Sequence, residues 1–157
     1  MKIRTLAFAI LTFFSPLFAE INYEEGVVYA FKGNIELKLD IAYPASGKMH
    51  PCIIFIHGGA WRAGTRKGYR KVIRAAANRG YVAATVDYRL TGVAPWPAQI
   101  EDVREAFLYL IKNASKYGID PERVGAIGDS AGGHLSLMLG LMPGEVKNGP
   151  RVRCIVN

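Results

Sequence analysis

Five consecutive residues, Gly128 to Gly132, read G-D-S-A-G between a strand-like run and a helix-like run. The preceding residues, Arg123 to Ile127, are typical of a strand, and residues 131–141 predict a helix. In this setting the chain must turn sharply enough to hold Ser130 in a strained backbone conformation beyond the end of the strand. Small residues around Ser130 let strand and helix approach, and a helix N-terminus favours negative charge. The pattern therefore predicts that Ser130 is a nucleophile.

The rest of the chain alternates between strand and helix patterns. Strands are predicted around Val27–Tyr29 and at Ile35–Tyr43, Cys52–Ile56, Val82–Val86, Arg123–Ile127 and Val152–Val156, and helices at 67–79, from Ile100 to Ala114, and at 131–141. The first two strands should pair antiparallel, and the second has one apolar face. We also expect a turn at Asp120–Glu122 and inward-facing side chains at Tyr69, Val72, Ile73 and Ala76. These patterns predict an α/β domain with a mostly parallel sheet and helices on both faces.

A second loop, His57 to Trp61, reads H-G-G-A-W directly after the apolar strand 52–56. A tetrahedral intermediate needs backbone N–H donors aimed at its oxygen, and glycines let the backbone approach closely. Loops at the carboxyl ends of neighbouring parallel strands face the same side of the sheet, so this loop should lie beside Ser130. A purely structural glycine turn is the alternative, which the nearby serine turn makes the weaker interpretation.

Together these segments resemble the α/β-hydrolase family, in particular its esterase and lipase branch. The V-D-Y-R-L run at Val86–Leu90, Pro97 with the helix that carries Asp102, and the stretch from Asp120 to Leu135 are similar to that branch as well. Feruloyl- and acetyl-esterase-like proteins and kynurenine formamidases share similar stretches. The resemblance covers about residues 26–157 and implies that Ser130 forms an acyl-enzyme.

The resemblance also implies which backbone groups form the oxyanion hole. The donors would be the N–H groups of Gly59 and Ala60, or of Gly58 and Gly59, together with that of Ala131. Ala60 stands where many relatives have a third glycine. Neither a cofactor nor a metal is expected, because the sequence has no dinucleotide-binding glycine motif and no Cys-x-x-Cys pair.

The sequence departs from the family in the groups that would activate Ser130. The triad order on this fold is Ser, then Asp or Glu, then His. After Ser130 the sequence has one acid, Glu145, and one histidine, His134. We expect His134 to point into its own helix packing and His57 to hold the oxyanion loop, with a Ser130–His57 dyad as the minor alternative. We therefore expect an N-terminal piece of a longer hydrolase, an incomplete domain over 20–157 that lacks its C-terminal strands and is inactive by itself.

Residues 1–19 have the layout of a secretory signal peptide. A positive start precedes an apolar run from Leu6 to Phe14, and Ala19 is a small residue before a cleavage point. The run is short for a bilayer span, so an uncleaved anchor is the weaker alternative. We expect a mature chain from Glu20 that is secreted or periplasmic and has no stable membrane anchor.

The chain has two cysteines, too few for a disulfide framework. Cys52 and Cys154 both lie in apolar runs, where cysteine acts as a small hydrophobic residue. We predict two buried, free thiols.

The formal net charge is +7, and no acid occurs from Ile41 to Val86. Within that segment Arg66, Arg70 and Arg74 form one helical stripe, which we interpret as a solvated outer face. The alternative is attraction of an anionic partner, such as an acidic polysaccharide or a membrane surface, with Arg62 and Arg66 steering an acidic ester. We do not expect nucleic acid as a partner, because export would remove the chain from it.

Three functions remain open on the sequence. The leading hypothesis is a serine ester hydrolase whose partner is a small-molecule or polysaccharide-linked ester. The second is an amidase, peptidase or acyltransferase of the same fold, because one nucleophile serves all of these reactions. The third is a non-catalytic binding protein with the hydrolase fold.

Overall fold

The computed structural model describes residues 20–142 and 150–157, so the predicted signal peptide and Glu145 lie outside the described residues. The described elements are β1 (Ile21–Lys32), β2 (Ile35–Pro44), β3 (His50–Ile56), the 3₁₀ helix η1 (Arg66–Tyr69), α1 (Arg70–Ala77), β4 (Val82–Val86), α2 (Ala98–Lys112), α3 (Ala114–Tyr117), β5 (Ile119–Gly128), α4 (Ala131–Leu141) and β6 (Cys154–Val156). Within the described ranges, no helix is both long and apolar enough to cross a membrane.

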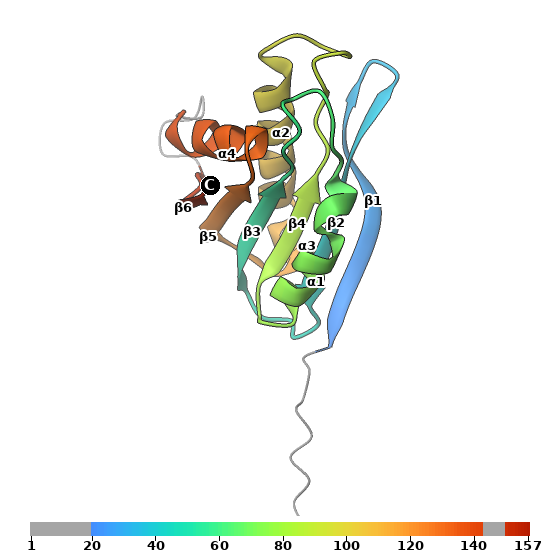
Figure 1. Ribbon diagram of the computed structural model, residues 1–157. Helices are drawn as coiled ribbons and strands as arrows, with labels where there is room; N and C mark the ends of the chain where they lie inside the picture. Colours follow the sequence, from blue (N-terminus) through green and yellow to red (C-terminus); the bar gives the residue numbers. More distant parts are fainter. Residues whose placement is uncertain (1–19, 143–149) are drawn as a thin grey trace, which may run out of the picture.

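The strands form one sheet in the order β1-β2-β4-β3-β5-β6 (Figure 1). β2 pairs antiparallel with β1 and with β4, whereas β4, β3, β5 and β6 run parallel. This arrangement confirms the predicted α/β class with a mostly parallel sheet. Ile56, the last residue of β3, is in register with Gly128, the last residue of β5. The loops that follow these two strands therefore start side by side.

Helices cover both faces of the sheet, as predicted. α1 lies on one face, and α2 and α4 lie on the other (Figure 1). The alternation along β3 sends Ile54 and Ile56 into the core beneath α2 and α4, whereas Ile53 and Phe55 face the side of α1. Burial on both faces explains why β3 reads as a continuous apolar run.

β2 differs from the prediction on its second face. Leu37, Leu39 and Ile41 are buried as expected, but Asp40 and Ala42 on the opposite face are also fully buried. The reason is that α1 packs across β2 as well as β4. The period of two along β2 therefore separates two buried environments, one of which contains a charge.

The segment predicted as one helix over 67–79 is divided into η1 and α1. Ile73 is buried as predicted, but Val72 is 44% exposed. A 3₁₀ turn advances its side chains by a larger angle per residue than an α-helix, so the face expected from one continuous α-helix is shifted. Two strands are also longer than predicted, because β1 extends over 12 residues and β5 absorbs the expected turn at 120–122.

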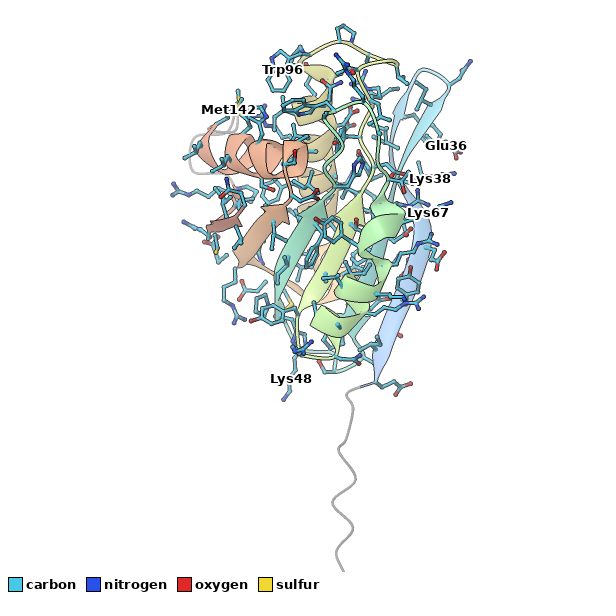
Figure 2. All side chains as sticks on the ribbon, viewed as in Figure 1. Glu36, Lys38, Lys48, Lys67, Trp96 and Met142 are labelled. Carbon is cyan, nitrogen blue, oxygen red and sulfur yellow. The ribbon has the colours of Figure 1, made fainter. Side chains whose placement is uncertain are left out.

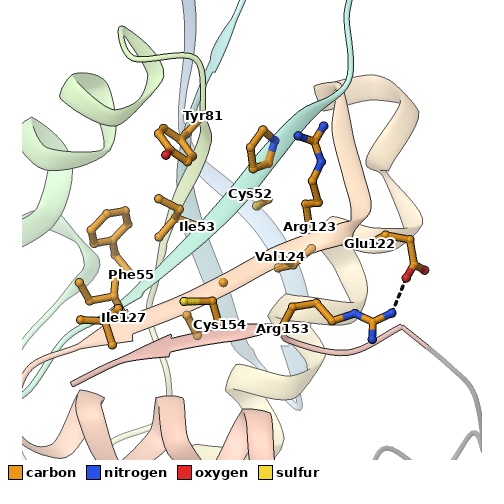
Figure 3. A pocket seen from close by; sticks show the side chains of 14 residues that line it. Cys52, Ile53, Phe55, Tyr81, Glu122, Arg123, Val124, Ile127, Arg153 and Cys154 are labelled. Carbon is orange, nitrogen blue, oxygen red and sulfur yellow. Dashed lines mark hydrogen bonds and ion pairs between the residues drawn. The ribbon is translucent and has the colours of Figure 1, made fainter.

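One apolar part of the sheet beside α1 remains open. A cavity of about 450 Å³ lies over β3, β5 and β6, with Ile53, Phe55 and Ile127 among its lining residues and the Arg153–Glu122 ion pair at its edge (Figure 3). Cys154 on β6 is exposed, which corrects the prediction that both cysteines are buried. The edge strand lacks a described covering element at this point. Cys52 is buried, and burial raises the pKa of its thiol to about 12.

Candidate active site

Ser130 occupies the sharp turn between β5 and α4. Its backbone has φ 47° and ψ −116°, and its side chain is exposed. A residue with a side chain held at positive φ stores of the order of 1–3 kcal/mol of strain, which the surrounding structure must hold in place. The turn is closed by hydrogen bonds from the N–H of Gly132 to the carbonyl of Asp129 (2.8 Å) and from the N–H of His134 to the carbonyl of Ser130 (3.0 Å).

Glycines at 128 and 132 allow α4 to pack directly on the ends of the central strands. A Cβ at Gly132 would lie 2.0 Å from the carbonyl oxygen of Ile56, and a Cβ at Gly128 would lie 2.3 Å from the carbonyl carbon of Gly132. The approach that the sequence pattern predicted is therefore present, and it brings the turn at Ser130 against the loop that follows β3.

The loop after β3 closes on itself through an unusual run of backbone conformations. Gly59, Ala60 and Trp61 all have positive φ values, of 114°, 51° and 58°. The carbonyl of Gly59 accepts hydrogen bonds from the N–H groups of Arg62 (2.9 Å) and Ala63 (3.0 Å). The turn is tight, because a Cβ at Gly59 would lie 2.2 Å from the carbonyl oxygen of Ala63.

The N–H groups of this loop differ in their availability. The N–H of Gly58 donates to Oδ1 of Asp129 at 3.0 Å. Within the described residues, the N–H groups of Gly59 and Ala60 donate to no protein acceptor, and both residues are exposed. Ala131 is the first residue of α4, so its N–H has no acceptor within the helix. The geometry favours Gly59 and Ala60 over Gly58 as donors to a ligand.

His57 holds the loop after β3 through hydrogen bonds, as expected from the sequence. Its Nδ1 lies 2.8 Å from the carbonyl oxygen of Gly58, and its ring stacks on Tyr88 with centroids 4.3 Å apart. The Tyr88 hydroxyl donates to the carbonyl of His57 at 2.9 Å, and burial raises the pKa of that phenol to about 12. His57 is itself buried and makes no hydrogen bond to Ser130 among the described residues, so the dyad alternative has no geometric support.

His134 does not point into the helix packing, which corrects the prediction made from the sequence. It is exposed on α4, edge-on to Trp61 at 5.4 Å between centroids and tilted against Trp96 at 5.9 Å. Trp96 lies at the end of the molecule where β3 and β4 end, whereas Lys48 marks the opposite end (Figure 2). The core face of α4 is taken by Leu135 and its neighbours, and this leaves His134 beside the two tryptophans.

The loop after β4 is fastened to α2 and to the loop after β3. Arg89 makes a two-pronged ion pair with the fully buried Asp102, with its Nη2 2.7 Å from Oδ1 and its Nε 2.8 Å from Oδ2. The Gln99 side chain donates to the carbonyl of Arg89 at 2.9 Å. The N–H of Thr91 donates to the carbonyl of Trp61 at 2.8 Å. These contacts connect the V-D-Y-R-L run to the candidate site.

Two of the three arginines of the basic stripe, Arg66 and Arg70, are partly buried in ion pairs, which corrects the charge interpretation for them, whereas Arg74 is exposed as that interpretation expected. The ion pairs of the stripe are Arg66–Asp40, Arg66–Asp87, Arg70–Asp40, Arg70–Glu25 and Arg74–Glu25. The acids come from β1, from β2 and from the end of β4, outside the acid-free segment. Arg66 therefore ties η1 to the sheet and is not available to steer an acidic ester, whereas Arg62 remains exposed.

Asp129 joins three parts of the site. Its Oδ1 accepts the N–H of Gly58 at 3.0 Å and the hydroxyl of Tyr69, from η1, at 2.6 Å. The hydrogen bond from Tyr69 is the main reason that the pKa of Asp129 lies below its usual range. Burial and the neighbouring carboxylate raise the pKa of Tyr69 to about 12. The sequence patterns did not indicate a role in the site for either Asp129 or Tyr69.

Within residues 20–142 and 150–157, no group that would activate Ser130 is in contact with it. Among the described residues, no histidine or carboxylate is hydrogen-bonded to the Ser130 side chain. The residues that the structure describes contain no cluster of three or more side chains that could hold a metal ion. The candidate site is thus a nucleophile turn beside a loop of backbone donors.

Comparison with known proteins places this geometry in a family. The BD-FAE family model matches residues 39–150. The chain belongs to the BD-FAE family, which is of the α/β-hydrolase type. Membership of this family agrees with the resemblance to the esterase and lipase branch that the sequence motifs indicated.

Relatives of this BD-FAE member include esterases. Carboxylesterase NlhH of Mycobacterium tuberculosis is 32% identical over 138 residues, which are 87% of this chain and 43% of that protein. The butyrate-bound esterase Est2 of Thermogutta terrifontis is 31% identical with a TM-score of 0.69, covering 80% of this chain and 45% of that one. The same esterase phosphonylated by sarin has a TM-score of 0.70 at 30% identity, covering 83% and 48%. The chain spans less than half the length of these relatives.

Proposed function

We propose that this BD-FAE member is a serine hydrolase of carboxylic esters that works through an acyl-enzyme on Ser130. The observation that carries the proposal is the exposed Ser130 at φ 47°, at the start of α4 and beside a loop in which the N–H groups of Gly59 and Ala60 have no acceptor among the described residues. The esterase names of the relatives support the choice of ester over other acyl compounds. In the reaction, Ser130 Oγ attacks the ester carbonyl carbon, the alcohol leaves with a proton, and water later releases the acid.

The oxyanion of the tetrahedral intermediate would be held by backbone N–H groups. We assign the N–H groups of Gly59, Ala60 and Ala131 to this task. Gly58 is the weaker candidate, because its N–H already donates to Asp129. Donors that are fixed in advance cost no reorganisation when charge develops, which makes them effective in the transition state.

The hydroxyl proton of Ser130 must pass to a general base. The order of the triad on this fold puts the acid and the histidine after Ser130. Among the described residues, neither His57 nor His134 is hydrogen-bonded to the Ser130 side chain, so we do not assign this task to either of them. Hydrolysis should therefore be measured on the protein expressed from its entire natural reading frame.

The substrate would be a small-molecule or polysaccharide-linked ester. The similar Est2 holds butyrate, which supports short acyl groups as first probes. We expect the kcat for hydrolysis of p-nitrophenyl acetate and butyrate to fall about a millionfold in Ser130→Ala, as expected for loss of a serine nucleophile. Ser115→Ala is the matched control, because Ser115 is exposed on α3 and should leave the rate unchanged.

Three outcomes would point elsewhere. Ester hydrolysis that survives Ser130→Ala contradicts the proposed nucleophile. Turnover of p-nitroanilides without turnover of esters favours the amidase or peptidase alternative. Binding of esters without any turnover favours a non-catalytic hydrolase-fold protein.

We further propose that the protein is exported and cleaved after Ala19. The proposal rests on the layout of residues 1–19, which lie outside the described residues. Expression in the native host should give a secreted or periplasmic chain whose N-terminal residue is Glu20, as read by mass spectrometry. A chain that stays with the cytoplasmic fraction and retains Met1 would contradict it.

A further inference from the structure

The carboxylate of Asp129 lies directly against the start of the oxyanion loop. Besides the 3.0 Å hydrogen bond from the Gly58 N–H, the fit is close enough that a Cβ at Gly58 would lie 2.3 Å from Oδ2 of Asp129. Asp129 is also the chain neighbour of Ser130. One side chain therefore connects the nucleophile turn with the loop of candidate donors across a sequence separation of 71 residues.

The loop beyond Gly58 behaves as one unit. Gly59 to Trp61 share positive φ values, and the turn closes on the carbonyl of Gly59 through two hydrogen bonds. At its far end, the carbonyl of Trp61 accepts the N–H of Thr91 at 2.8 Å. The direction of the Gly59 and Ala60 N–H groups therefore depends on how the loop is held at its two ends, and Asp129 holds the end nearer to Ser130.

The orientation of the Asp129 carboxylate is fixed from a third element. Tyr69 donates to Oδ1 at 2.6 Å from the end of η1. η1 is itself tied to the sheet, because Arg66 pairs with the fully buried Asp40 at 2.7 Å and with Asp87. Hydrogen bonds to an ionised acceptor are roughly twice as strong as neutral ones, so the charge on Asp129 stiffens the connection.

We propose that Asp129 is a positioning residue that occupies the Gly58 N–H and thereby aims the Gly59 and Ala60 N–H groups at the oxyanion formed on Ser130. The inference rests on the proposed function and deepens it, because it names the group that selects the donors. Asp129 acts through the loop and does not touch the substrate. Its removal affects the transition state more than the bound ester, since oxyanion donors act where charge develops.

The test compares variants of the protein expressed from its entire natural reading frame. We expect Asp129→Ala to lower kcat for p-nitrophenyl acetate roughly a hundredfold, with KM changed less than about threefold, because misplaced donors weaken only the transition state. Asp129→Asn keeps an oxygen that accepts the Gly58 N–H, so its kcat should be about tenfold higher than that of Asp129→Ala. Tyr69→Phe leaves the hydrogen bond between Asp129 and Gly58 in place, so its kcat should fall only several-fold. Asp120→Ala, at the other end of β5, is the matched control and should keep wild-type kcat.

Rates are divided by the number of active sites, counted by fluorophosphonate titration, so that a variant with a misfolded fraction is not mistaken for a slow enzyme. Per-site kcat of Asp129→Ala within threefold of wild type overturns the inference, as does an Asn variant no better than the Ala variant. If the Ala variant does not fold, the per-site kcat values of the Asn and Phe variants are compared with that of wild type. Values equal to wild type for both variants overturn the inference. No hydrolysis by wild type, or hydrolysis that survives Ser130→Ala, overturns the proposed function and this inference with it.

Discussion

Replacing Gly132 with alanine should lower the free energy of unfolding by about 3 kcal/mol or more, at the upper end of the cost of overpacking a core. The added Cβ would lie 2.0 Å from the carbonyl oxygen of Ile56. That oxygen belongs to the backbone of a central strand, so the clash cannot be relieved by turning a side chain. We expect a melting temperature lower by roughly 10 °C and loss of hydrolysis in the protein expressed from its entire natural reading frame.

The control for this prediction is Gly68→Ala. Gly68 lies in η1, where an added Cβ would meet no atom within 4 Å and the backbone does not need a positive φ. A methyl group there reduces the freedom of the unfolded chain and should leave stability equal or slightly higher. Equal melting temperatures for the Gly132 and Gly68 variants would show that the close approach of α4 to β3 is not required.

The second large effect is expected at Asp40. This fully buried carboxylate accepts hydrogen bonds from Arg66 (2.7 Å), Arg70 (2.7 Å) and the N–H of Gly26 (2.7 Å). Asp40→Asn leaves two partly buried guanidinium groups without this countercharge, and we expect a loss of about 3 kcal/mol in the free energy of unfolding at neutral pH. Chemical denaturation measures the loss. Asp120→Asn, which removes the partner of the exposed Arg123, should cost much less than Asp40→Asn.

The effect of Asp40 should depend on pH in a defined direction. Burial alone would raise the pKa of Asp40, but the hydrogen bonds from Arg70 and Arg66 outweigh it, and the pKa lies below its usual value. The ionised group therefore contributes stability above its ordinary pKa of about 4, and this contribution is lost as the pH falls through the lowered pKa. The difference between wild type and Asp40→Asn should shrink at acidic pH. A difference that grows on acidification would contradict the assignment.

The sheet and the nucleophile turn were predictable because local patterns encode them. Buried parallel strands such as 52–56 read as apolar runs. The glycines at 128 and 132 predict the close approach of helix and strand that the structure shows. The boundaries of α4 were predicted as observed, since small residues and the strained Ser130 turn mark its start. Fold class and the place of Ser130 thus follow from short-range signals.

The connections between distant segments were not predictable in the same way. The alternation along β2 assigns Asp40 to a solvated face, because nothing near β2 in sequence shows that α1 covers that face. The acids that pair with the basic stripe are at least 21 positions away from their arginines in the sequence, so the pairing depends on the assembled sheet. The Tyr69–Asp129 hydrogen bond joins residues 60 positions apart, and its direction depends on a 3₁₀ turn that the helix pattern did not reveal.

Covalent labelling of Ser130 tests the central claim most directly. The protein expressed from its entire natural reading frame is treated with a fluorophosphonate, digested, and mapped by mass spectrometry, with Ser130→Ala treated in parallel. We predict a single phosphonyl adduct on the peptide that contains Ser130 and none in the variant. An unlabelled Ser130 in folded protein that hydrolyses esters, or an adduct that persists in Ser130→Ala, would contradict the account.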